Sequence, residues 1–240
     1  TCRGGFHDPA LFFENGNMYV ISAAGGNCSI QQLSLDSEKG VVNTVGSSKR
    51  LFNASKDWSL WEGAHAYKVG DYYNDGTKEG VVFEVSADGR SGKIVSMKQS
   101  SEELLWLSDS AEQKRLIGAN SETNGAYNMA KVKAISGWQS KYPTFKWCAD
   151  LGEGWYLPSI EELKAFTLNT AIHDAVNRTL IARGGTKLYD KGERVWYWSS
   201  TESDYKLSGE FCACYVSMGY GHTYGSLKRS HSYVRAVSAF

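Results

Sequence analysis

The sequence lacks an excess of charge of either sign, and it lacks any long apolar run. Its 240 residues include 26 Lys plus Arg and 26 Asp plus Glu, so the formal net charge is zero. Nucleic acids and anionic membranes select basic surfaces, so we expect neither to be the main partner. No apolar stretch approaches the ~18 residues that a membrane-spanning helix needs. We therefore expect no direct membrane span.

Paired cysteines and metal-binding spacings are also missing. The number of cysteines, five, is odd, so at least one thiol has no partner within the chain. None forms a Cys-x-x-Cys pair, and none stands at the spacing of a zinc site. We predict free or buried thiols, no metal site and no cofactor. The cysteines are Cys2, Cys28, Cys148, Cys212 and Cys214.

Aromatic residues, by contrast, are plentiful: the chain has 8 Trp, 14 Tyr and 9 Phe, with 25 Gly and only 3 Pro. This composition is typical of an exported domain with short strands and many loops. Tyr and Trp are favoured on binding surfaces because they are large and amphipathic; the alternative is that most of them form the core. The chain begins with Thr1 rather than Met, so we interpret it as a mature or trimmed sequence from which any export signal has gone. The absence of a signal therefore indicates nothing about the compartment.

The hydrophobic pattern predicts an α+β chain with one boundary, between residues 1–68 and 69–240. In the first part, Leu11–Phe13 and Met18–Ser22 flank Asn15-Gly16, which predicts a hairpin. Cys28–Leu35 predicts a further strand. We predict that this part is a short β-rich segment.

In the second part, strands at both ends enclose a helical region. Ser159 and Glu162 form a capping-box pattern after Pro158, which predicts the start of a helix. Ser108 and Glu112 indicate a short helix. The remaining predicted helices are 126–135, 142–150, 160–166 and 172–180, and the predicted strands are 80–85, 93–97, 195–199, 212–218 and 233–240.

Four motifs occur in order in the second part: Trp147–Asp150, Gly154–Leu163, Tyr197–Glu202 and Tyr233–Val237. Together they resemble one family, the Fibrobacter-major or DUF1566-type domain. The resemblance implies a C-type-lectin-like fold of the formylglycine-generating-enzyme-like branch over residues 69–240. It also implies that Trp155 and Trp198 are apolar anchors and that Arg235 is buried against carbonyls or a carboxylate such as Glu202.

The C-terminal segment 203–232 carries a narrower resemblance, to the variable proteins of diversity-generating retroelements. In such systems Asn codons are rewritten to a small set of residues, and this segment consists largely of that set and contains no Asn. The alternative is an ordinary polar loop rich in Ser, Gly and Tyr. On the first interpretation one exposed patch forms the ligand-binding surface: Ser203, Asp204, Tyr205, Ser208, Tyr215, Ser217, Tyr220, His222, Tyr224, Ser226, Ser230, His231 and Ser232.

This resemblance implies a binding protein, not an enzyme. Its partner would be a protein or glycan on another cell or a phage, and its location the cell exterior or surface, with a phage particle as the alternative. On this interpretation His222 and His231 contact the ligand and are not catalysts. We expect no metal at either histidine, because no carboxylate or second histidine lies at ligand spacing. The Glu-Pro-Asn and Gln-Pro-Asp motifs of calcium-binding C-type lectins do not occur.

The first part carries a separate resemblance. Phe6–Tyr19 and Trp61–Lys68 resemble pieces of a family 43 glycoside hydrolase, a β-propeller, and the resemblance implies that Asp8 and Glu62 match a pKa-tuning Asp and a general acid. Glycoside cleavage also needs a base, and residues 6–68 have room for little more than one blade. We therefore expect no hydrolase activity. The remaining alternatives are a carbohydrate-active protein that uses Asp8 and Glu62, and a structural surface or pilus-associated module.

Overall fold

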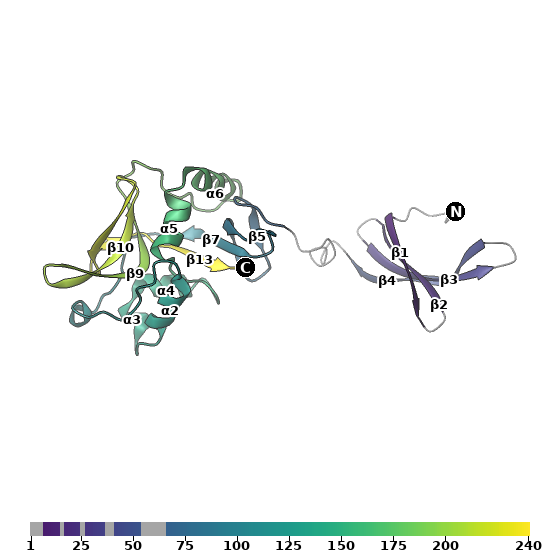
Figure 1. Ribbon diagram of the computed structural model, residues 1–240, viewed down its shortest axis with the longest axis horizontal. Helices are drawn as coiled ribbons and strands as arrows, with labels where there is room; N and C mark the ends of the chain where they lie inside the picture. Colours follow the sequence, from purple (N-terminus) through teal and green to yellow (C-terminus); the bar gives the residue numbers. More distant parts are fainter. Residues whose placement is uncertain (1–6, 15–16, 25–26, 37–40, 54–65) are drawn as a thin grey trace. The chain divides into compact units, whose positions relative to one another are not determined.

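The computed structural model divides the chain into two compact units, Thr1–His65 and Ala66–Phe240 (Figure 1). It describes residues 7–14, 17–24, 27–36, 41–53 and 66–240. The division lies three residues before the boundary predicted after residue 68. Among the described residues, no helix combines the length and the apolar character needed to cross a bilayer.

The first unit is a four-stranded antiparallel sheet in the order β1-β2-β3-β4. The predicted hairpin is confirmed in its pairing, since Phe13 lies opposite Met18 and Glu14 opposite Asn17; its turn, residues 15–16, lies outside the described residues. The last strand was not predicted, because its apolar residues do not alternate regularly with polar ones; they are Val41, Val42, Val45, Leu51 and Phe52. The strands are β1 His7–Glu14, β2 Asn17–Ala24, β3 Asn27–Asp36 and β4 Val41–Asn53.

In the second unit, the largest sheet also has four strands, in the order β13-β7-β6-β5. The hairpin predicted over residues 80–97 is confirmed, with Val81 opposite Val95. The C-terminal strand returns to pair with β7, where Val237 lies opposite Val95, so distant parts of the unit share one sheet. The strands are β5 Tyr72–Asn74, β6 Glu79–Val85, β7 Gly92–Gln99 and β13 Arg235–Ala239.

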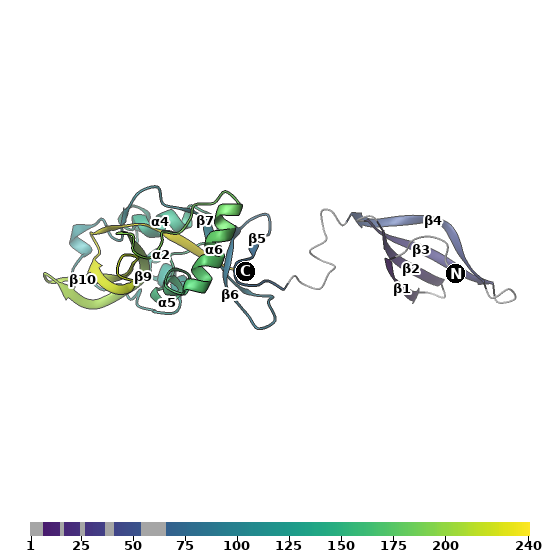
Figure 2. The ribbon, with the colours of Figure 1, turned by 90° about the horizontal axis from the view of Figure 1, so that it is seen from above.

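The predicted helices are present, with ends shifted by one to a few residues. The turn predicted from Ser108 begins instead after Asp109, whose carboxylate accepts the Ala111 N–H at 3.0 Å and caps a short 3-10 helix, η2 Ser110–Glu112. The α-helices are α2 Gly125–Lys133, α3 Trp138–Lys141, α4 Pro143–Ala149, α5 Ile160–Thr167 and α6 Thr170–Ala182. In Figures 1 and 2, α5 lies between the sheet that contains β7 and the strands β9 and β10. The second unit is thus a mixed α and β fold with mainly antiparallel strands.

Tryptophans anchor the core of this unit. Trp106 and Trp198 are fully buried, and Trp155 is 5% exposed, so the predicted anchoring role of Trp155 and Trp198 is confirmed. Each fully buried indole N–H finds a backbone carbonyl: Trp106 donates to Ser199 O and Trp198 donates to Leu104 O, both at 2.9 Å. These large apolar rings are therefore buried without leaving an indole N–H unpaired, and their burial stabilises the second unit.

Arg235 is fully buried, and it contacts carbonyls rather than a carboxylate. Its guanidinium donates to Ser96 O at 3.0 Å and to Thr186 O, so it ties β7 to the loop after α6. Burial lowers the pKa of Arg235 to about 10. Of the two partners predicted for Arg235, the carbonyls are therefore right and Glu202 is wrong.

Glu162 connects the capping box to the rest of the core. Its carboxylate accepts the Ser159 N–H at 2.8 Å, which closes the capping box predicted from the sequence. The same carboxylate accepts the Gly125 N–H and the Tyr156 hydroxyl, each at 3.0 Å, and it pairs with Lys93 at 3.1 Å. One side chain that is 4% exposed thus joins α2, α5 and β7.

We predict that Glu162→Ala lowers the free energy of unfolding by about 3–5 kcal/mol, because the N–H groups of Gly125 and Ser159 and the Tyr156 hydroxyl lose their buried acceptor. Glu161→Ala is the matched control: this neighbouring carboxylate is exposed and pairs only with Lys164, so the change is expected to stay within ~0.5 kcal/mol. Urea denaturation of the two variants measures the difference. Equal stabilities would contradict the central role of Glu162.

Candidate functional site

The predicted binding segment folds largely as a three-stranded antiparallel sheet in the order β11-β10-β9. Its strands are β9 Trp196–Leu207, β10 Glu210–Ser217 and β11 His222–Leu227. Figures 1 and 2 show β9 and β10 at the opposite end of the second unit from β5. A short ladder follows, in which β12 His231–Ser232 pairs with β8 Leu104–Leu105.

Most of the predicted binding residues reach the surface of this sheet or its turns. The half-buried ones are Ser203, Tyr215, Ser226 and Ser230. The exposed ones are Asp204, Tyr205, Ser208, Tyr220, His222, Tyr224 and His231. Whether these side chains bind a ligand stays a prediction.

Two predicted contact residues are buried, and the prediction is wrong for them. Ser217 is 1% exposed because it ends β10 between Trp196 and His222, and its hydroxyl oxygen accepts the Tyr220 N–H at 3.4 Å. Ser232 is 4% exposed because it pairs with Leu104 in the β8–β12 ladder. Neither serine exposes enough of its side chain to contact a ligand.

A row of aromatic rings crosses the sheet from the core to the surface. Trp198, Tyr215 and Tyr224 lie opposite one another on β9, β10 and β11, and each neighbouring pair has ring centroids 6.0 Å apart. Tyr220, in the β10–β11 turn, meets Tyr224 edge-on at 6.4 Å. We call Tyr215, Tyr220 and Tyr224 the tyrosine row. Its outer members are 74% exposed at Tyr220 and 44% at Tyr224.

The predicted single patch is divided between two faces of the sheet. Successive residues of a strand point to opposite faces, so Cys214 and Tyr215 face away from each other. Cys214 lines a cleft of about 310 Å³ together with Ser203, Asp204 and Glu122. The prediction of one continuous patch is therefore wrong: the tyrosine row occupies one face of β10 and the cleft lies on the other.

An ion pair lies buried behind the cleft. The Lys228 ammonium donates to the Glu202 carboxylate and, at 3.0 Å, to Arg115 O; its side chain has no exposed area. Glu202 also accepts the backbone N–H groups of Ile117 at 2.8 Å and Gly118 at 3.0 Å. Burial lowers the pKa of Lys228, and the facing carboxylate opposes that effect. Sequence reasoning missed this pair, since Lys228 stands among exposed polar residues.

The three cysteines whose side chains the structure describes are free thiols, as predicted. Cys148 and Cys212 are buried and Cys214 is half-buried, and all three are free. Burial raises the pKa of each thiol, to about 11 for Cys214, so the thiolate is scarce at neutral pH. Cys2 lies outside the described residues. Among residues that the structure describes, no group of three His, Cys, Asp or Glu side chains is placed to hold a metal ion.

The side chains of the alternative carbohydrate-active site lie outside what the structure describes. Asp8 belongs to β1, but its side chain lies outside what the structure describes, as do Glu62 and its neighbour His65. The role of Asp8 and Glu62 therefore stays a prediction.

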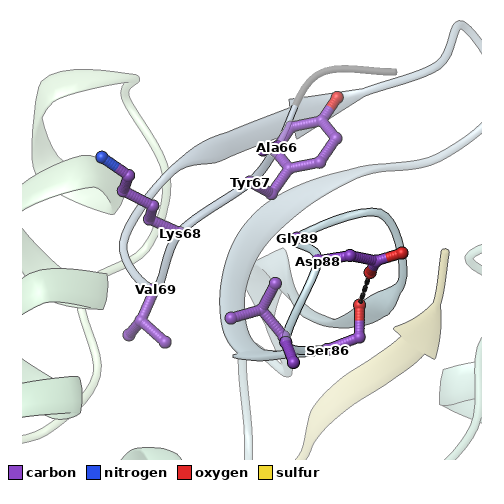
Figure 3. A pocket seen from close by; sticks show the side chains of 9 residues that line it. Ala66, Tyr67, Lys68, Val69, Ser86, Asp88 and Gly89 are labelled. Atoms are coloured by element: carbon purple, nitrogen blue, oxygen red, sulfur yellow. Dashed lines mark hydrogen bonds between the residues drawn. The ribbon is translucent and has the colours of Figure 1, made fainter. Parts of the chain in front are cut away.

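A second hollow, of about 330 Å³, lies at the beginning of the second unit. Figure 3 shows it between residues 66–69 and the β6–β7 turn, 85–89. The Ser86 hydroxyl donates to the Asp88 carboxylate there at 2.7 Å. The hollow contains none of the residues predicted to bind, so the sheet β9–β11 remains the candidate site.

Positions of the segment 203–232 differ in how much their substitution is expected to destabilise the fold. We predict that Lys228→Ala lowers the free energy of unfolding by about 3–5 kcal/mol, because Glu202 would remain buried without its cation. Arg229→Ala is the matched neighbour: its side chain is 57% exposed and pairs with Glu210 at the surface, so a change within ~0.5 kcal/mol is expected. Thermal and urea unfolding measure both variants. A Lys228→Ala variant as stable as the wild-type protein would contradict a stabilising role of Lys228 opposite Glu202.

Comparison with known proteins adds no further constraint to this picture. No protein-family model matches the chain, and a search of curated proteins finds no match. The function is therefore argued from the residues and the geometry of the sheet β9–β11.

Proposed function

We propose that this chain is a recognition protein that displays a diversified C-terminal surface on a C-type-lectin-like scaffold. The surface is the sheet β9–β11 with its turns, and the ligand is a protein or glycan on another cell or a phage. The proposed location is the cell exterior or surface, or a phage particle. The mixed α and β architecture of the second unit is compatible with the lectin-like fold implied by its four motifs.

The observation that carries this proposal is the tyrosine row. Tyr220 and Tyr224 expose large amphipathic rings, while ring contacts through Tyr215 to the buried Trp198 hold them in position. Pre-ordered aromatic side chains lose little conformational entropy on binding, and tyrosines dominate the contact surfaces of antibodies for this reason. His222, which is exposed and shares its face of β11 with Tyr224, provides a polar contact beside the rings.

The distribution of burial supports diversification of the segment. The positions rewritten in a retroelement would have to tolerate many side chains, and Tyr220, His222 and Tyr224 are exposed where such changes are tolerated. Lys228 and Ser232, by contrast, are buried, and Lys228 also forms an ion pair with Glu202. Comparison of related genes tests this directly: differences should fall at adenine positions of a nearby template copy and avoid the Lys228 codon.

A second candidate function rests on the first unit. Its four-stranded antiparallel sheet has the strand number of a propeller blade, in keeping with the glycoside hydrolase resemblance. We propose no activity for it, because a base across the scissile bond is not identified. Turnover of aryl arabinosides or xylosides that Glu62→Gln abolishes would replace the binding proposal with a carbohydrate-active one.

We predict that Tyr220→Ala and Tyr224→Ala each weaken ligand binding at least tenfold, ~1.4 kcal/mol or more, since exposed aromatic anchors dominate such interfaces. Tyr127→Ala is the matched control: Tyr127 on α2 is 44% exposed, the same as Tyr224. Glycan arrays and arrays of bacterial and phage surface proteins provide the ligands, and surface plasmon resonance measures affinity. A ligand bound equally by all three variants would place recognition elsewhere.

A further inference from the structure

The outer strand of the candidate site has an open backbone edge. Within the second unit, β11 pairs with β10 alone and forms one end of the sheet order β11-β10-β9. The pairing runs from Cys212–Leu227 to Ser217–His222 with no shift of register. In an antiparallel pair alternate residues direct their N–H and C=O groups away from the partner. About half of the β11 backbone therefore points to the open edge.

Little along this strand protects the edge. Exposed edges are normally blocked by charged residues, proline or a β-bulge, and His222–Leu227 contains no Lys, Arg, Asp, Glu or Pro and no bulge. Leu227 O is the exception, since it accepts the Ser230 N–H at 2.8 Å. The open part is thus His222–Ser226, in which the first three side chains are exposed.

Aromatic rings flank this edge on both faces of the sheet. Tyr224 belongs to the tyrosine row on one face. On the other face, Cδ1 of Tyr205 lies 3.7 Å from the position that a Cβ atom on Gly225 would occupy. Tyr205 is 57% exposed, so its ring covers the glycine and still faces solvent. A strand added beside β11 would direct alternate side chains toward Tyr224 and toward Tyr205.

We infer that the β11 edge binds an extended polypeptide segment of a protein partner by strand addition. The inference rests on the proposed recognition function and names its partner class. Open main-chain donors and acceptors at strand spacing, with aromatic contacts on alternate sides, match a peptide backbone. A glycan has neither main-chain amides at strand spacing nor side chains that alternate between two faces. Main-chain hydrogen bonds would persist when β11 side chains change, while those side chains select the sequence that binds.

The test uses the full chain and random decapeptides displayed on phage as the probe. Peptides selected on the wild-type protein are expected to lose at least tenfold in affinity on Thr223→Lys, which places a charged side chain on the edge strand. Thr123→Lys is the matched control, since Thr123 is equally an exposed threonine but lies outside the sheet. Circular dichroism of both variants verifies that they are folded.

Single N-methylation of the selected peptide gives the decisive readout. Strand addition predicts affinity losses of about tenfold at every second residue, because only alternate N–H groups meet β11. Since β11 contains no Lys, Arg, Asp or Glu, binding should also change less than twofold between 50 and 500 mM NaCl.

Three outcomes would overturn the inference. Panning that enriches no peptide, or N-methylation without a period of two, excludes strand addition. A wild-type protein that sediments as a dimer, and that Thr223→Lys makes monomeric, identifies a second copy of this chain as the occupant of the edge. If Tyr220→Ala still abolishes binding to an array ligand in any of these cases, the proposed recognition function stands and the edge inference alone fails.

Discussion

The buried contact between Lys228 and Glu202 is the constraint on which the candidate site depends. Glu202 lies on β9, its other acceptor contacts hold residues 117–118, and Lys228 follows β11 directly. One ion pair thus fixes the two outer strands of the sheet and the loop beside the cleft. A buried pair stabilises little in net terms, since desolvation of both charges offsets their attraction. Its effect is on geometry: the pair joins β9, the residue after β11 and residues 117–118 in one buried contact.

In this arrangement, the residues that stabilise the sheet are different from the residues that are exposed on its surface. Indole N–H groups, Arg235 and Glu162 satisfy backbone groups within the core, and Lys228 extends that support into the segment 203–232. The exposed positions between these supports contribute little to stability, because surface substitutions rarely exceed ~0.5 kcal/mol. A surface of this kind tolerates changes of side-chain identity without loss of the fold, which is the physical requirement of a diversified binding site.

Local signals in the sequence predicted local structure well. The capping box at Ser159 and Glu162 and the hairpins around residues 15–16 and 86–91 are confirmed, because each depends on neighbouring residues only. Other features depend on residues far apart in sequence, so the hydrophobic periodicity does not predict them. They are the burial of Ser217 and Ser232 and the pairing of Glu202 with Lys228. Polar composition therefore located the segment but predicted neither its buried lysine nor its division between two faces. Resemblance alone still supports the lectin-like fold.

The division between two faces changes what kind of recognition the sheet supports. A single flat patch binds a ligand from above, whereas the tyrosine row and Tyr205 approach the β11 edge from opposite faces. Side chains on both faces converge only at the edge, so a ligand that contacts both must lie alongside the strand. In the proposed strand addition, backbone groups of the edge supply part of the binding energy, and that part is independent of the residues present at Tyr224 or His222. Variation at these positions then alters which sequence binds without removing the interaction that holds it.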